Sequence, residues 1–137
     1  MKNYVNALKH QLDEAAQLGL LAATKTVYIG GGTPSLLGQD AADLAQNVSA
    51  LTQPSEFSME ANPDSLSDDL LANLSKGGVT RISLGVQSFN DNELKRLGRI
   101  HSADLAYDRV LVAKEHGYDV SVDLMCAIPE QTESSWE

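Results

Sequence analysis

Four short apolar segments in this chain each end in glycine or polar residues, and this repetition constrains the fold more than any single motif. The four endings are Gly30-Gly31-Gly32-Thr33-Pro34, Glu60-Ala61-Asn62-Pro63, Gly85-Val86-Gln87-Ser88 and Asp123-Leu124-Met125. The apolar segments are short and bounded by turn-forming residues, so each is predicted to be a β-strand. Because the carboxyl ends of parallel strands open onto one face, these endings are expected to converge on a single ligand site.

Apolar spacing and turn residues predict the order helix, strand, helix, strand, helix, strand, two helices, strand. The predicted strands span 26–29, 57–60, 81–86 and 120–125, and the predicted helices span 5–21, 40–51, 67–77, 90–98 and 102–117. Asp40, Ser67 and Ser102 are the expected N-caps, and Asn90 with Glu93 has the form of a capping box. Since crossovers between parallel strands are almost always right-handed, the helices are expected along the outside of the sheet.

The pattern therefore predicts an α/β fold with about four parallel strands, arranged as a partial (βα) barrel with outer helices. Four strands cannot close a barrel, and uncovered strand edges favour aggregation. We expect a missing portion of the barrel or an oligomer partner to cover these edges.

Composition narrows the class of protein. The 137 residues fit one domain or a large part of one, and 42% apolar with 21% charged residues is typical of a globular chain. A net charge of −9 with scattered lysines and arginines argues against nucleic acid as a main partner. No basic leader opens the sequence and no apolar run approaches about 18 residues, so we expect no membrane span and a cytoplasmic location.

The glycine run and Glu60 carry the first candidate chemistry. Three consecutive glycines leave backbone N–H and C=O groups open to a ligand, although an isolated run of this kind is more often a tight turn. The run matches neither the phosphate-binding loop nor the dinucleotide fingerprint. Glu60 ends an otherwise apolar strand and is a good acceptor for a ribose or an amine; the alternative is a structural ion pair with Arg81.

The third and fourth strands supply the remaining polar candidates. Period-two alternation places Gln87 on one face with Ser83 and Gly85, where small side chains leave room for a ligand. Asp123 lies inside a strand and needs a partner, for which Arg99 is the expected cation. The alternative is that Arg99 is a solvated surface residue.

Other residues are assigned to structure rather than to chemistry. His101 is expected at the surface, and Tyr28, Phe57 and Met59 are expected in the core. Cys126 is expected to be a small buried hydrophobe. As the only cysteine, it excludes an internal disulfide and any metal or iron–sulfur site that needs several thiolates from this chain alone. No catalytic residue is predicted.

These motifs together resemble one family. They are residues 27–37 (Val-Tyr-Ile-Gly-Gly-Gly-Thr-Pro-Ser-Leu-Leu), 60–63 (Glu-Ala-Asn-Pro), 81–89 (Arg-Ile-Ser-Leu-Gly-Val-Gln-Ser-Phe), 97–101 (Leu-Gly-Arg-Ile-His) and 123–125 (Asp-Leu-Met). In order and spacing they resemble the radical S-adenosylmethionine family of oxygen-independent coproporphyrinogen III oxidases and HemW-type heme chaperones. Residues 85–91 and 97–101 look more like the chaperone branch.

The resemblance implies a cofactor site. It implies that the glycine run contacts the methionine part of S-adenosylmethionine and that polar residues from the other strand ends line the same pocket. The implied cofactor-binding residues are Gly30, Gly31, Gly32, Thr33, Glu60, Gln87, Arg99 and Asp123. The implied fold is a partial barrel that holds the cofactor at its strand ends.

The chain also departs from the family. The family binds a [4Fe-4S] cluster on a Cys-x-x-x-Cys-x-x-Cys loop that would precede the first helix, and no such loop is present. Cys126 stands where the family usually has an aromatic residue, and Ala127-Ile128-Pro129 replaces Gly-Leu-Pro. We therefore expect residues 1–137 to form an incomplete radical S-adenosylmethionine core domain, inactive in redox chemistry by itself.

The expected function is that of a segment of a protein of heme or porphyrin metabolism, with heme or porphyrinogen as a possible ligand of the parent. The alternative is a non-catalytic module derived from the same fold that binds a nucleoside or heme.

Overall fold

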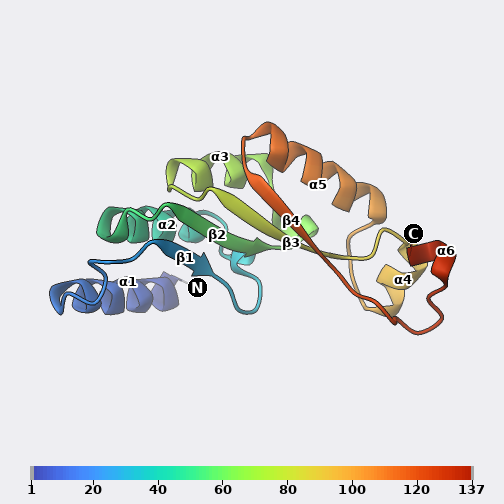
Figure 1. Ribbon diagram of the computed structural model, residues 1–137, viewed down its shortest axis with the longest axis horizontal. Helices are drawn as coiled ribbons and strands as arrows, with labels where there is room; N and C mark the ends of the chain where they lie inside the picture. Colours follow the sequence, from blue (N-terminus) through green and yellow to red (C-terminus); the bar gives the residue numbers. More distant parts are fainter. Residues whose placement is uncertain (1, 137) are drawn as a thin grey trace.

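A single four-stranded parallel sheet, in the order β1-β2-β3-β4, organises the chain in the computed structural model, which describes residues 2–136 (Figure 1). The strands are β1 (Thr26–Ile29), β2 (Glu56–Ala61), β3 (Arg81–Gln87) and β4 (Asp119–Leu124). Ile29 pairs with Met59 and Glu60 pairs with Ser83, so neighbouring strands end near one another. The predicted α/β class and the predicted succession of helices and strands along the chain are confirmed.

Helices and short 3-10 turns precede, connect and follow the four strands. They are α1 (Lys2–Gln17), α2 (Gln39–Thr52), α3 (Asp68–Lys76), α4 (Asp91–Arg96), α5 (Ala103–Glu115) and α6 (Glu133–Trp136), with short 3-10 turns η1 (Pro34–Leu37) and η2 (Pro63–Ser65). In Figure 1, α4 and α6 lie beyond the carboxyl ends of the strands, whereas α2, α3 and α5 run alongside the sheet. The strand ends are therefore framed by η1, η2 and the segment that follows α4.

The core lies between the sheet and its helices. Phe57, Met59, Ile82 and Leu84 are fully enclosed and face Leu71 and its neighbours in the same apolar cluster. The prediction that Phe57 and Met59 are core residues is confirmed. Since successive side chains of a strand point to opposite faces, the residues between them in β2 and β3 face away from the helices. That second face carries the polar residues of the predicted site.

Three of the predicted N-caps are confirmed. Ser67 and Ser102 accept hydrogen bonds from Leu70 N and Leu105 N, each at 3.2 Å. Asn90 accepts from the backbone N–H groups of α4. The predicted cap at Asp40 is wrong. Helix α2 begins at Gln39, and the N-cap position is Gly38, which has no side chain to cap the helix. Asp40 lies in the first turn, where its carboxylate interacts favourably with the helix dipole.

In the predicted capping box, Ser88 links Glu93 to the backbone of Asn90. Glu93 does not reach back to Asn90 itself; its Oε2 accepts a 2.6 Å hydrogen bond from Ser88 Oγ, which in turn accepts from Asn90 N at 3.0 Å. Ser135 Oγ and Gln131 Nε2 donate to the same carboxylate at 2.6 and 3.0 Å. Hydrogen bonds from Ser135 and Ser88, in that order, lower the pKa of Glu93. This buried carboxylate therefore anchors α6 against α4.

The first helix is shorter than predicted. It ends at Gln17 rather than at residue 21, because Gly19 adopts a left-handed conformation with φ +72°. Leu20 N then bonds to Ala15 O and Gly19 N to Ala16 O, which is the hydrogen-bond pattern of a Schellman motif. Leu18 and Leu20 are consequently exposed, and the prediction that the helix continues to residue 21 is wrong.

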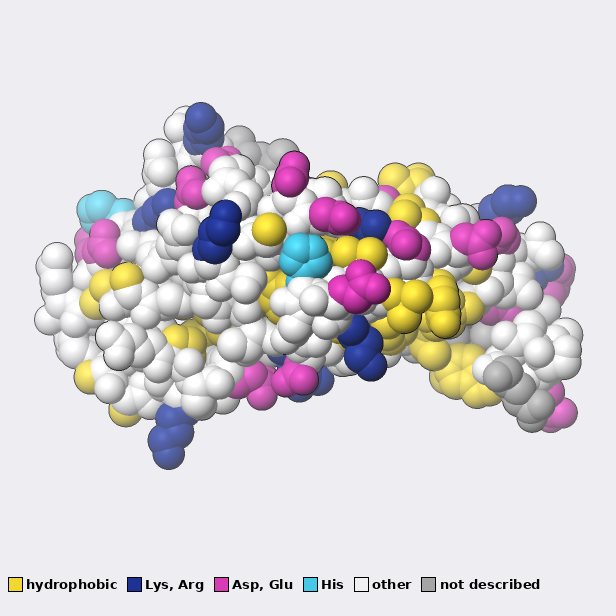
Figure 2. Space-filling view, turned by 90° about the horizontal axis from the view of Figure 1, so that it is seen from above, with side chains coloured by type: hydrophobic (Ala, Val, Ile, Leu, Met, Phe, Trp, Pro, Cys, Tyr) yellow, Lys and Arg dark blue, Asp and Glu magenta, His cyan; other side chains and the backbone are white. Residues whose placement is uncertain are grey.

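The surface is acidic and without a basic cluster on the face shown in Figure 2. Lysine and arginine side chains are scattered there, with acidic side chains between them. Among residues 2–136, no helix combines the length and apolar character needed to cross a bilayer.

Candidate functional site

A polar hollow of about 230 Å³ lies at the carboxyl ends of the strands. Its lining residues are Gly32, Thr33, Glu60, Ala61, Asn62, Ser83, Gly85, Gln87, Arg99 and Asp123. The structure thus brings Gly32, Thr33, Glu60, Gln87, Arg99 and Asp123 together, as the sequence predicts. Gly30 and Gly31 lie against the same site through their contacts with Glu60.

Glu60 is held in place by two donors. Tyr28 donates its hydroxyl hydrogen to Oε1, and Gly31 N–H donates to Oε2 at 2.9 Å. Both hydrogen bonds lower the pKa of Glu60, and the one from Tyr28 has the larger effect, so the carboxylate is ionised at neutral pH. The same hydrogen bond to a carboxylate raises the pKa of Tyr28 to about 12.

Two expectations about these residues are wrong. Tyr28 is 60% exposed rather than in the core, because its ring lies on the sheet face opposite the helices and its hydroxyl reaches Glu60. The alternative ion pair between Glu60 and Arg81 does not form. Arg81 lies 3.9 Å from Glu56, at the other end of β2.

The glycine run is required by both backbone conformation and space. Gly31 and Gly32 have φ values of +96° and +66°, in the left-handed region that favours glycine. A Cβ at Gly30 would lie 3.1 Å from the carboxyl carbon of Glu60. The run therefore bends the backbone at Gly31 and Gly32, and it lets Glu60 approach the backbone.

An irregularity in β3 positions Gln87. The pairing with β4 shifts between Leu84 and Gln87, and Gln87 has a φ of +70°. Such a bulge re-aims a side chain, and here Gln87 lines the hollow with Ser83 and Gly85, as predicted. A Cβ at Gly85 would lie 2.9 Å from Asn62 Oδ1, so this glycine leaves room for the amide of Asn62.

Arg99 and Asp123 line the same hollow without pairing. Arg99 Nη2 donates to Gly85 O at 3.1 Å, and Asp123 Oδ2 accepts from Ser83 Oγ at 3.1 Å. The predicted Arg99–Asp123 ion pair is wrong, because the backbone carbonyl of β3 holds the guanidinium instead. The alternative of a solvated Arg99 is also wrong. Both charges therefore retain hydrogen-bonding capacity toward a ligand.

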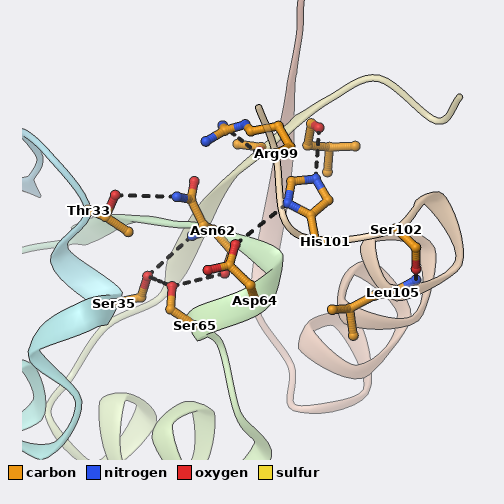
Figure 3. Close-up of polar contacts among 11 residues, drawn as sticks. Thr33, Ser35, Asn62, Asp64, Ser65, Arg99, His101, Ser102 and Leu105 are labelled. Carbon is orange, nitrogen blue, oxygen red and sulfur yellow. Dashed lines mark hydrogen bonds and ion pairs between the residues drawn. The ribbon is translucent and has the colours of Figure 1, made fainter. Parts of the chain in front are cut away.

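Sequence reasoning missed Asn62 and Ser83 as site residues. Asn62 Nδ2 donates to Thr33 Oγ1 at 3.3 Å, and Asn62 N donates to Ser35 Oγ at 3.2 Å (Figure 3). The available signal was position: Asn62 stands two residues after Glu60 at a strand end, and Ser83 shares the face of Gln87. From the sequence, Asn62 is expected only to make an extended exit before proline, and the structure has that backbone conformation.

His101 and Cys126 are both placed differently from their expected positions. His101 is buried, with Nε2 3.1 Å from Val86 O and Nδ1 3.6 Å from Asp64 Oδ1 (Figure 3). It is drawn inward because the end of β3 offers its ring a backbone acceptor. Cys126 is exposed, because the chain turns at the surface directly after β4.

The residues of this chain do not fit an iron–sulfur cluster. A [4Fe-4S] cluster is held by several cysteine thiolates, and the sequence contains one cysteine. Within residues 2–136, no group of three or more His, Cys, Asp or Glu side chains is placed to hold a metal ion. The polar hollow, in contrast, offers carboxylates, a guanidinium and an amide to an organic ligand.

A second hollow, of about 500 Å³, lies between α1, β1 and α2. The residues that line it include Leu8, Leu12, Leu44 and Val48, and no charged side chain is among them. It is larger than the polar hollow and borders it at Tyr28, Gly31 and Thr33, but no charged side chain lines it. The chemistry of the chain therefore gathers at the strand ends.

The fold and the site define the class of protein. The sequence profile described as the Radical SAM superfamily matches residues 3–137. The chain belongs to the radical SAM superfamily.

Within this superfamily the sequence is similar to heme chaperones. It is 39% identical to the heme chaperone HemW of Lactococcus lactis over 135 residues, which cover 93% of this chain and 35% of that protein. It is 40% identical to HemW of Escherichia coli, with 95% of this chain and 36% of that protein covered. The chain thus spans about a third of the length of these curated relatives.

The solved structures agree with the sequence relatives. The coproporphyrinogen III oxidase HemN of Escherichia coli, a radical SAM enzyme, matches with a TM-score of 0.84 at 27% identity, covering 98% of this chain and 32% of that one. Methylornithine synthase matches with a TM-score of 0.68 at 19% identity, over 87% of this chain and 35% of that one, which shows a shared fold only. The predicted family and its chaperone branch are confirmed.

Proposed function

We propose that the polar hollow binds S-adenosylmethionine and that residues 1–137 form part of a radical SAM core domain of the heme chaperone branch. The single observation that carries this proposal is the convergence of Glu60, Gln87, Arg99 and Asp123 with Gly32 and Thr33 around one hollow. Membership of the superfamily supports the choice of ligand.

The chemistry of the hollow matches the groups of this ligand. S-Adenosylmethionine carries an ammonium group, a carboxylate, a sulfonium and ribose hydroxyls. The side chains of Glu60 and Asp123 accept hydrogen bonds from the ammonium and the hydroxyls, and Arg99 pairs with the carboxylate. The backbone of Gly30, Gly31 and Gly32 and the Thr33 hydroxyl contact the methionine part.

The volume limits how much of the ligand the described residues enclose. Pockets for drug-sized ligands span roughly 300–1,000 Å³, and this hollow measures about 230 Å³. The strand ends of this chain therefore line one side of the ligand. Since the residues present do not fit the [4Fe-4S] cluster of the family, no redox step is assigned to the chain itself.

The wider role follows the named relatives. Curated relatives are heme chaperones and a solved neighbour is a coproporphyrinogen oxidase, so we propose that the parent protein acts on heme or a porphyrin. The similarity in sequence to the chaperones favours heme transfer.

Calorimetric titration of the chain with S-adenosylmethionine tests the cofactor site. The chain is expected to bind, and Glu60→Gln is expected to weaken binding by about tenfold, because a charge-assisted hydrogen bond is worth roughly 1.5–3 kcal/mol. Glu56→Gln is the matched control: it lies on the same strand, at the end away from the hollow. Absence of binding, or equal weakening in both variants, would contradict the proposal.

A further inference from the structure

His101 contacts Val86 and Asp64, which neighbour lining residues of the polar hollow in sequence, and is not itself among the lining residues. Its side chain is fully enclosed, and it joins two elements of the site. Nε2 is 3.1 Å from Val86 O, in β3, and Nδ1 is 3.6 Å from Asp64 Oδ1, in η2. Nδ1 has no hydrogen-bond partner within 3.5 Å although it is cut off from solvent. A buried polar atom without a partner is costly, so its orientation toward a carboxylate calls for a function.

The two neighbours determine where the ring must carry hydrogen. A backbone carbonyl only accepts, so Nε2 donates to Val86 O. If Nδ1 carried a lone pair, it would repel the facing oxygen of Asp64. If Nδ1 carries a hydrogen, that hydrogen points to an acceptor. The bridge between the two elements is therefore complete only when both ring nitrogens carry hydrogen.

The charges around the ring are few and well placed. Asp64 of η2 faces it, and Arg99 lies two residues before it on the same loop. Asp91, at the start of α4, accepts a hydrogen bond from Ala103 N at 2.8 Å. On α5, Arg109 forms ion pairs with Asp68 and Asp108. Asp64 is thus the carboxylate that His101 contacts.

We propose that His101 is a positioning residue whose imidazolium bridges Asp64 and the Val86 carbonyl and thereby fixes the geometry of the cofactor site. This inference rests on the proposed function of the hollow. Each end of the bridge adjoins a lining residue: Val86 precedes Gln87 and Asp64 follows Asn62 by two positions.

The loop that carries His101 also positions Arg99, another residue that lines the polar hollow. Arg99 is separated from His101 by the exposed Ile100, and its guanidinium bonds to Gly85 O, one residue before Val86. Figure 3 shows Arg99 and His101 reaching β3 from the same loop, with Asn62 and Asp64 on the opposite side. Locking the ring therefore restrains Asn62, Gln87 and Arg99 relative to one another.

Long-range ¹H–¹⁵N spectra of the histidine rings in the full 137-residue chain test the bridge. In the unmodified chain, both nitrogens of His101 are expected to carry hydrogen. In Asp64→Asn, the ring is expected to become neutral with hydrogen on Nε2, while the exposed His10 and His116 keep their signals. A neutral ring in the unmodified chain, or hydrogen on Nδ1 alone, would overturn the proposal.

Ligand affinity then separates positioning from packing. With S-adenosylmethionine as the titrant, Asp64→Asn is expected to weaken binding about three- to tenfold, the equivalent of one net hydrogen bond, whereas the exposed Asp69→Asn is not. His101→Gln retains a donor for Val86 O and is expected to bind more tightly than His101→Leu. Equal affinities for Gln and Leu variants that are both folded would overturn the positioning role.

The test also distinguishes failure of the bridge from failure of the proposed function. If the unmodified chain does not bind S-adenosylmethionine, the proposed function fails, and the side-chain N–H signals of Gln87 and Arg99 in the ligand-free chain become the readout. Asp64→Asn is expected to shift both signals and Asp69→Asn neither. Unmoved signals in Asp64→Asn would refute the bridge.

Discussion

Tyr28 shows how one exposed side chain prepares a charged site residue. Its hydroxyl donates to Glu60, which lowers the pKa of the carboxyl group and raises that of the phenol to about 12. Because folding lowers the pKa of Glu60 below its ordinary value of 4.5, ionised Glu60 stabilises the folded chain above that pH. The contribution is lost as pH falls through the lower folded value.

Tyr28→Phe removes the strongest cause of this shift. We expect the pKa of Glu60 to rise toward its ordinary value, since only the Gly31 N–H remains as a donor. The affinity for S-adenosylmethionine is expected to fall about threefold, because one net hydrogen bond is no longer orienting the carboxylate. Carbon-13 NMR titration of the Glu60 carboxyl group measures the pKa, and Tyr107→Phe, equally exposed at 60%, is the control. An unchanged Glu60 titration in Tyr28→Phe would show that the hydroxyl does not hold the carboxylate.

At the scale of elements, local signals determined what could be predicted. The β3 strand, predicted over 81–86, is Arg81–Gln87, and Ser67 and Ser102 cap their helices, because alternation and capping depend on near neighbours in sequence. Glu93 is the counterexample. Its partners Ser88 and Ser135 could not be assigned from a capping-box pattern, since one of them lies more than forty residues away along the chain.

The partners of the site residues could not be predicted from the sequence for the same reason. Arg99 bonds to Gly85 O rather than to Asp123, and His101 lies inside rather than outside, because backbone acceptors of β3 become available only once the sheet has formed. Strand-end position was enough to gather Glu60, Gln87 and Asp123 in one site. It could not tell which of them pair.

Glu93→Gln tests the anchoring of α6. The ionised carboxylate accepts from Ser88, Ser135 and Gln131, and an amide replaces one of its acceptor oxygens with a donor. We expect amide hydrogen exchange across 131–136 to accelerate several-fold, with little change in β2. Glu133→Gln, at an exposed position of the same segment, is the control. Equal exchange in both variants would contradict the anchoring role.

At the scale of the whole molecule, the sheet order β1-β2-β3-β4 leaves β1 and β4 at its two edges. The chain covers about a third of its curated relatives and carries one cysteine, which is too few thiolates to hold a four-iron cluster, so we propose a cofactor-binding role without a cluster for the residues present.

Anaerobic reconstitution with iron and sulfide tests this division. The purified chain is expected to retain less than one four-iron cluster per chain, and Cys126→Ser is expected to behave in the same way. Iron and sulfide analysis after desalting measures the content. Four iron atoms bound stably per chain, together with formation of 5′-deoxyadenosine, would contradict the assignment.

The central claim is that the strand ends of this sheet form a site for S-adenosylmethionine. Amide chemical-shift mapping during titration of the ¹⁵N-labelled chain tests it most directly. We expect the largest shifts on residues 30–33, 60–62, 85–87, 99 and 123. Because Gly30, Gly31 and Thr33 also line the apolar hollow, the contradicting result is a set of shifts confined to its helix residues, such as Leu8, Leu12, Leu44 and Val48, or no shifts at saturating ligand.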